Sequence, residues 1–178
     1  MDFLKKAIKN YPIICLAVVF VLIFGIVAGV KYLNNDQRSP EMTLEKYYTA
    51  FYAEQDIDML KETVTDLLRT QVDSELGMAY IGNSTILTMY AQGVMDTVGY
   101  DGFAVTVDVL SNERSTAEVL GNVRSTYADA TAYHIVKYQV TFAGDMGSFV
   151  QEGETCLVKR SDGRWYMVES MPYLTEVK

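Results

Sequence analysis

Apolar and polar positions follow three different patterns along the chain, and each pattern predicts a different kind of structure. Residues 11–30 form an apolar run with no charge between Lys9 and Lys31. From residue 40 to about residue 69 apolar residues recur every three or four positions, as in helices that pack on a core. From residue 103 onward they recur at every second position, as in strands with one buried face.

The apolar run predicts a transmembrane helix over residues 11–32. Twenty residues at about 1.5 Å each span roughly 30 Å, the thickness of the hydrocarbon core of a bilayer. Thirteen of the residues in 11–30 are Ile, Leu, Val or Phe. The run is flanked by Tyr11 and Tyr32, where interfacial aromatic residues are expected. This pattern predicts an integral membrane protein with a single span.

The charges beside the span predict its orientation. Lys5, Lys6 and Lys9 precede it with only Asp2 opposing them, which favours a cytoplasmic tail at residues 1–10. Everything after the span would then lie outside the cytoplasm, held at the cell membrane.

Two further readings of the span concern its processing and its packing. The run can also be interpreted as a cleaved signal peptide. It is longer than the apolar region of a usual signal peptide, however, and Val27 and Gly29 form a poor cleavage site. Gly25 and Gly29 have the small-xxx-small spacing that lets two membrane helices pack closely. That spacing makes a homodimer possible, although glycine is also common in membrane helices for other reasons.

The second pattern predicts a polar connector at 33–39 and then a series of helices. Ser39-Pro40-Glu41 is a typical helix start, with an N-cap, a proline in the first turn and an acidic residue near the dipole. A helix is expected to about Ala53, followed by one capped by Asp56 that ends near Arg69. Residues 71–99 predict two short helices.

The third pattern predicts five antiparallel strands over about 103–109, 117–124, 134–142, 149–160 and 164–169. Ser161-Asp162-Gly163 joins the last two as a hairpin turn. Helices followed by a meander of strands predict an α+β fold with the helices on the apolar face of the sheet. One domain over residues 40–178 is expected.

Charge and cysteine content narrow the function classes. Residues 41–178 carry 21 acidic and 10 basic residues, a net charge of −11. Such a balance excludes nucleic acid as a partner and argues against anionic lipid headgroups, because both require a basic patch. Cys15 lies in the predicted span and Cys156 is alone after it, so no disulfide is expected in the exported part. This usage suits a bacterial surface protein.

Three segments together resemble the nuclear transport factor 2-like superfamily, within its small membrane-anchored bacterial members. They are the helix Pro40-Glu41-Met42-Thr43-Leu44-Glu45-Lys46-Tyr47-Tyr48-Thr49-Ala50-Phe51-Tyr52, the segment Asp56-Ile57-Asp58-Met59-Leu60, and the closing hairpin 157–168. The resemblance covers about residues 40–170 and rests mainly on core positions. It implies a cone in which a curved sheet wraps around helices, and it implies no single activity, since the fold hosts isomerases, dehydratases, secretion scaffolds and adaptors.

Few residues are candidates for chemistry. The sequence contains no phosphate-binding loop and no nucleophile elbow, and one His with isolated Cys residues argues against a metal site. No cofactor is expected. His134, on the apolar side of its predicted strand, is the one weak catalytic candidate, with Tyr52, Tyr138 and Asp108 as imaginable neighbours. A histidine hydrogen-bonded at the rim of the core is the simpler interpretation.

Tyrosines are the better candidates for binding, because a tyrosine side chain suits pocket walls and interfaces with one wet end. Eleven of them follow the span. The candidate binding residues are Tyr52, Tyr138, Tyr166 and Tyr173. Of these Tyr138 also suits simple core packing, whereas Tyr166 and Tyr173, near the C-terminus, suit an interface.

These observations favour a non-catalytic module anchored in the membrane, which binds a small ligand or a membrane-proximal protein partner outside the cytoplasm. One alternative is a scaffold like the bitopic subunit of type IV secretion and conjugation machines. The other is an isomerase-like or dehydratase-like enzyme that uses a polar residue in the cone.

Overall fold

The computed structural model describes residues 21, 29, 35–76 and 85–177, and these residues divide into two compact units, Met1–Asp36 and Gln37–Lys178. The predicted tail 1–10 and the predicted span 11–32 lie outside the described residues, apart from Val21 and Gly29. Gly25 lies outside them as well. In the described part of the chain, no helix has the length and apolar character needed to cross a bilayer.

The first helix of the second unit begins where the sequence predicts it. Helix α3 (Pro40–Tyr48) follows Ser39, whose side chain accepts a hydrogen bond from the Met42 amide at 3.2 Å. The helix continues as a π-helical turn, η1 (Thr49–Ala53), in which the Glu54 amide donates to the Thr49 carbonyl. The prediction of a helix from residue 40 to 53 is therefore confirmed, with a wider last turn.

The second predicted helix is in fact two. Asp56 caps α4 (Ile57–Thr63) as predicted, by accepting hydrogen bonds from two amides of its first turn. The helix stops early because Val64 is extended and forms a β-bridge with Met167. Helix α5 (Asp66–Leu76) then begins, so the expectation of one helix to Arg69 is wrong.

The region 71–99 differs from the two short helices that the sequence predicts. Residues 71–76 belong to α5, which begins earlier, at Asp66. Helix α6 (Thr85–Val98) is a single helix of 14 residues, and Gly93 does not interrupt it. Residues 77–84 lie outside the described part of the chain.

In the described part of the chain, an antiparallel meander forms one five-stranded sheet in the order β1-β2-β3-β4, with β5 paired to β3 beside this path. The long strands are β1 (Ala104–Arg114), β2 (Ala132–Gly144) and β3 (Gly147–Lys159), and the short ones are β4 (Trp165–Met167) and β5 (Leu174–Glu176). The predicted turn before β4 is confirmed: the Arg160 amide donates to the Arg164 carbonyl, and Gly163 takes a positive φ of 83°.

One predicted strand is wrong. Residues 117–124 form helix α7 (Ala117–Thr126), capped by the Thr116 side chain. Leu120, Val123 and Tyr127, spaced three and four apart, pack on a small apolar cluster that includes Val158 and Tyr166. The alternation of Val119, Gly121 and Val123 imitated a strand, but the packed stripe has the spacing of a helix.

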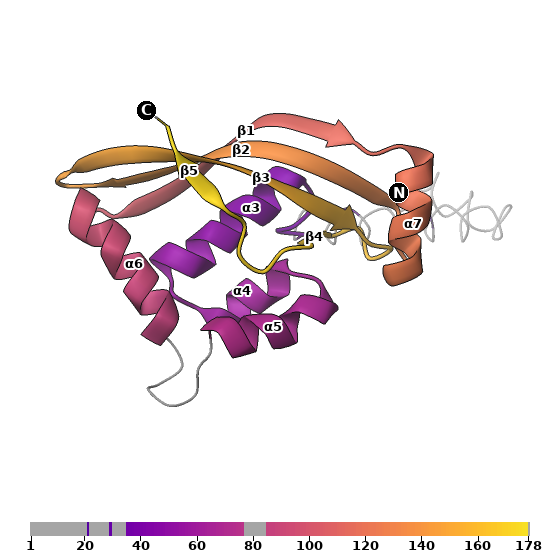
Figure 1. Ribbon diagram of the computed structural model, residues 1–178, viewed down its shortest axis with the longest axis horizontal. Helices are drawn as coiled ribbons and strands as arrows, with labels where there is room; N and C mark the ends of the chain where they lie inside the picture. The colour runs from indigo at the N-terminus through magenta and orange to yellow at the C-terminus, as the bar shows by residue number, and fades with distance from the viewer. Residues whose placement is uncertain (1–20, 22–28, 30–34, 77–84, 178) are drawn as a thin grey trace, which may run out of the picture. The chain divides into compact units, whose positions relative to one another are not determined.

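The unit is therefore α+β, with helices α3 to α6 below one face of the curved sheet and α7 at one end (Figure 1). The core lies between these layers. It is built from α3 residues such as Leu44, Tyr47 and Tyr48 and from strand residues such as Tyr138 and Phe142, all at most 2 % exposed.

The predicted polar connector is partly a core element. Gln37 is fully buried; its Nε2 donates to the carbonyls of Glu62 and Trp165, and its carbonyl accepts from the Trp165 amide at 2.8 Å. The compact unit thus starts at Gln37, three residues earlier than the predicted domain boundary at residue 40.

Candidate functional site

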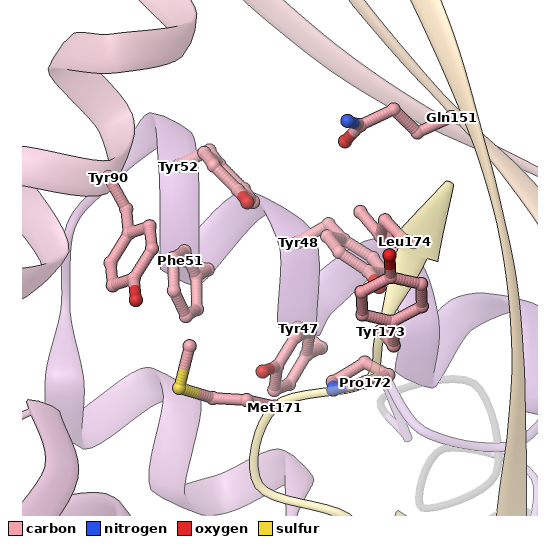
Figure 2. Close-up of a pocket in the computed structure, with 10 residues that line it drawn as sticks. All are labelled: Tyr47, Tyr48, Phe51, Tyr52, Tyr90, Gln151, Met171, Pro172, Tyr173 and Leu174. Carbon is pink, nitrogen blue, oxygen red and sulfur yellow. The ribbon is translucent and has the colours of Figure 1, made fainter. Parts of the chain in front are cut away.

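A cleft of about 310 Å³ opens between the first helix, α6 and the segment that leads to β5 (Figure 2). We call it the tyrosine cleft. Its wall on the α3 and η1 side is aromatic, Tyr90 comes from α6, Gln151 comes from β3, and four consecutive residues close the other side. The lining residues are Tyr47, Tyr48, Phe51, Tyr52, Tyr90, Gln151, Met171, Pro172, Tyr173 and Leu174.

Helix periodicity creates the aromatic wall. Tyr47, Tyr48 and Phe51 fall on one stripe of the first helix, and Tyr52 stacks on Tyr48 with ring centroids 6.3 Å apart. Tyr47 also holds the opposite wall, because its hydroxyl donates to the Ser170 carbonyl at 2.6 Å. One helix thus supplies most of the surface of the cleft and fixes the segment that faces it.

A buried hydroxyl pair lies beneath this wall. The hydroxyls of Tyr48 and Tyr138 are 2.7 Å apart, and burial raises the pKa of both groups well above the ordinary value. The Tyr138 ring lies against Gly153, where a Cβ atom would stand only 2.7 Å from the ring. Glycine is therefore required opposite Tyr138 for this ring to reach its partner.

Tyr52 is the polar group best placed to meet a ligand. Burial raises the pKa of its phenol to about 12, so the hydroxyl stays protonated at neutral pH. No residue in the described part of the chain hydrogen-bonds this hydroxyl. Its ring is fixed by an edge-on contact with Phe142 at 4.8 Å, so the hydroxyl is held in place without a protein partner.

The mouth of the cleft exposes large apolar side chains. Tyr173 is 82 % exposed, and Tyr90 and Met171 are exposed by about half and two fifths. Met89, beside Tyr90 on α6, is also exposed. Apolar groups gathered at the rim of a hollow are typical of a surface that another molecule covers.

The tyrosine cleft is lined by aromatic, aliphatic and uncharged polar groups. The residues that line it include no Asp, Glu, Lys, Arg or His. Burial raises the pKa values of Tyr47, Tyr48 and Tyr52 above the ordinary value. A group that exchanges protons near pH 7 is what general acid–base catalysis needs, and no lining residue supplies one. Ring faces, hydroxyls and one amide remain, which suit an uncharged ligand surface.

Three of the four predicted binding tyrosines meet here and one does not. Tyr52 and Tyr173 line the cleft, and Tyr138 hydrogen-bonds a lining residue from below. Tyr173 also borders a second hollow of about 390 Å³ that Tyr138 and Gly153 line. Tyr166 is buried in the separate cluster under α7, where its hydroxyl donates to Asp162 at 2.6 Å.

His134 lies away from the tyrosine cleft. Its Nδ1 is 2.5 Å from the Asn112 Oδ1, and its ring meets Trp165 edge-on at 4.5 Å. Tyr138 lies four residues further along β2, about 13 Å at the usual rise per residue. Asp108 is exposed and pairs with Gln139 in the β1–β2 register. The fold therefore does not bring Tyr52, Tyr138 and Asp108 together around His134.

Other cleft residues escaped the sequence analysis. Tyr90 was missed because 71–99 was divided into short helices, although it belongs to a continuous amphipathic helix. Gln151, Met171, Pro172 and Leu174 give no local signal, since only the return of the chain beside β3 places them at the cleft. Cys156 is half-buried on β3, and burial raises the pKa of its thiol, which opposes a nucleophilic role.

In the described part of the chain no group of three or more His, Cys, Asp or Glu side chains is placed to hold a metal ion. Comparison with known proteins adds no assignment. No family model matches the chain, and no curated protein matches it either.

Proposed function

We propose that this chain is a non-catalytic binding module, anchored in a cell membrane by residues 11–32, whose extracytoplasmic domain receives a partner or ligand in the tyrosine cleft. The observation that carries the proposal is the cleft itself, which is aromatic, uncharged and rimmed by exposed apolar side chains. Aromatic residues with a polar end are enriched where proteins bind other molecules.

The fold supports a nuclear transport factor 2-like domain as part of this proposal. Helices α3 to α6 cover one face of a curved antiparallel sheet, as the resemblance implies (Figure 1). A hollow between the helices and the sheet is where such a cone would hold a ligand. The cleft lies at that position, between the first helix, α6 and β3.

The buried position of Gln37 supports a partner close to the membrane. If the span ends at residue 32, only residues 33–36 separate it from the compact unit. Five Cα steps reach at most about 17 Å. A domain on so short a tether stays beside the bilayer, so its partner is the external part of another membrane protein or a ligand at that surface.

The position of His134 favours binding over the isomerase-like or dehydratase-like alternative. Its side chain contacts Asn112 and Trp165 and does not line the cleft. An enzyme of that type would need a base beside the bound substrate.

Site-specific photocrosslinking in intact cells tests the proposal. A photoreactive amino acid replaces Tyr173, at the cleft mouth, and in a matched variant it replaces Tyr100, which is 57 % exposed outside the cleft. We expect a discrete product in the membrane fraction from position 173 and none from position 100. The product should weaken when Tyr52→Phe and Gln151→Ala are added, because these changes remove polar groups of the cleft. Equal products from both positions, or no product from position 173, would refute the proposal.

A further inference from the structure

Three basic side chains lie on neighbouring strands, β1, β2 and β3, and two of them contact Trp165. Arg114 is the register partner of His134 across β1 and β2, and the Lys159 Nζ lies 5.8 Å from the centre of the Trp165 ring. The His134 ring meets the same indole edge-on at 4.5 Å. We call Arg114, His134 and Lys159 the cationic cluster.

Few acidic side chains lie close enough to neutralise the positive charges of the cationic cluster. Among the residues that the structure describes, no carboxylate pairs with Arg114 or Lys159. Glu62, whose carbonyl accepts from Gln37 beside Trp165, directs its carboxylate to Lys46 at 2.7 Å. Glu113 follows Asn112 on β1, and strand alternation places it on the opposite face of the sheet. The charged groups that face His134 are thus Arg114 on β1 and Lys159 on β3. Burial has the largest effect in lowering the pKa of His134, and the charges of these two residues lower it further.

The geometry of His134 leaves one ring nitrogen for an anion. Its Nδ1 donates to Asn112 Oδ1, because an amide oxygen can only accept. The Nε2 atom is therefore the position that gains a proton when the ring becomes charged. An anion beside Nε2 would favour the charged form and would be attracted by Arg114 and Lys159, whose charges act on the same ring.

The position of the cluster identifies the occupant. Two hydrogen bonds join Gln37 to the backbone of Trp165 and a third joins it to the Glu62 carbonyl, so the chain that comes from residue 36 reaches the unit beside the cluster. Residues 33–36 place that point within about 17 Å of the end of the proposed span. We propose that the cationic cluster docks on the phosphodiester headgroups of anionic lipids, which orients the domain on the bilayer.

This inference rests on the membrane anchor of the proposed function, although not on the tyrosine cleft. The acidic balance of the domain does not oppose it. Charges on the remote faces are screened over about 8 Å at physiological salt, whereas a headgroup in the cluster would be in contact. The sequence argued against anionic headgroups because the net charge of residues 41–178 is −11, but the fold gathers basic side chains from separate strands in one place.

The single histidine of the chain gives a direct measurement. The full chain, labelled at histidine, is reconstituted in phosphatidylcholine bicelles with and without phosphatidylglycerol, and the His134 pKa is followed by NMR. We expect phosphatidylglycerol to raise the pKa by about half a unit or more, because an anion stabilises the protonated ring. Co-elution of the chain with the bicelles separately tests the proposed anchor, so failure of the anchor and failure of the cluster are distinguished.

Two double variants supply the control. Arg114→Gln with Lys159→Gln should abolish the lipid-dependent shift, whereas Lys137→Gln with Arg69→Gln, which removes the same charge elsewhere, should retain it. An unchanged far-ultraviolet circular dichroism spectrum shows that each variant is folded; Trp165 fluorescence does not serve here, because Lys159 lies over that ring. No shift with phosphatidylglycerol would overturn the proposal, and so would an equal shift in both double variants. A shift with inorganic phosphate but none with the lipid would identify a site for a soluble anion and would also overturn headgroup docking.

Discussion

Substitution of Gly153 by alanine tests how the tyrosine wall is held together. A Cβ atom at residue 153 would lie 2.7 Å from the Cζ and hydroxyl oxygen of Tyr138 and 2.8 Å from a methyl group of Leu174. Contacts this short cannot be accommodated without movement. Tyr138 would have to leave its position, and its hydroxyl would lose the partner on Tyr48. Leu174, the register partner of Gly153, would also shift and disturb the pairing of β5.

The magnitude follows from these contacts. Overpacking of a well-filled core costs about 1–3 kcal/mol. Loss of one hydrogen bond between neutral groups adds about 1 kcal/mol. The free energy of unfolding should therefore fall by about 2–4 kcal/mol. For a domain of this size that corresponds to a decrease in the midpoint temperature of roughly 10 °C.

Thermal unfolding of the full chain, followed by the fluorescence of Trp165, measures this effect. The matched control is Gly121→Ala in α7, where a Cβ atom would meet nothing within 4 Å. Alanine favours a helix over glycine by about 1 kcal/mol, so this variant should be unchanged or slightly more stable. In a Tyr138→Leu background, Gly153→Ala should cost less, because the ring that it clashes with is gone. An equal cost in both backgrounds, or a cost no greater than that of Gly121→Ala, would refute this account of the wall.

Three further outcomes are expected. Trp165→Ala should lower the free energy of unfolding by about 3–5 kcal/mol in urea denaturation, because the indole is 5 % exposed; a wild-type fluorescence maximum typical of water would contradict this burial. Burial and neighbouring cations lower the pKa of His134 below its ordinary value, so the folded state prefers the neutral ring. The midpoint temperature of unfolding should therefore decrease as the pH falls below about 6.5, and it should decrease less in His134→Gln. A parallel pH dependence of the two proteins would count against this role. A cysteine at residue 178, in a chain without Cys15 and Cys156, should react with an impermeant maleimide in intact cells, and labelling only after lysis would reverse the proposed orientation.

Much of the local structure could be predicted because its causes are local. The caps at Ser39 and Asp56 and the glycine turn at Gly163 each require a particular residue type at one position, and all three form as expected. The long strands β2 and β3 could also be predicted, since each buries alternate residues against a helical layer. Their periodicity is a consequence of that burial and is visible in the sequence.

Local patterns failed where two structures fit the same residues. Residues 117–124 alternate like a strand and also carry a helical stripe, and contact with Val158 and Tyr166 selects the helix. The helix after Asp56 had no visible reason to stop at Thr63. It stops because Val64 joins Met167, about a hundred residues away in the chain.

The sequence by itself determined the α+β class, the positions of the caps and turns, and the tyrosine stripe of the first helix, because each depends on neighbours within a few residues. Only the tertiary structure decided what those residues face. It placed Tyr90 and Gln151 opposite Tyr52, separated His134 from the cleft, and bound Gln37 to Trp165. It also gathered basic side chains from three strands in a domain of acidic composition, since composition records the total charge and the fold decides where each charge lies.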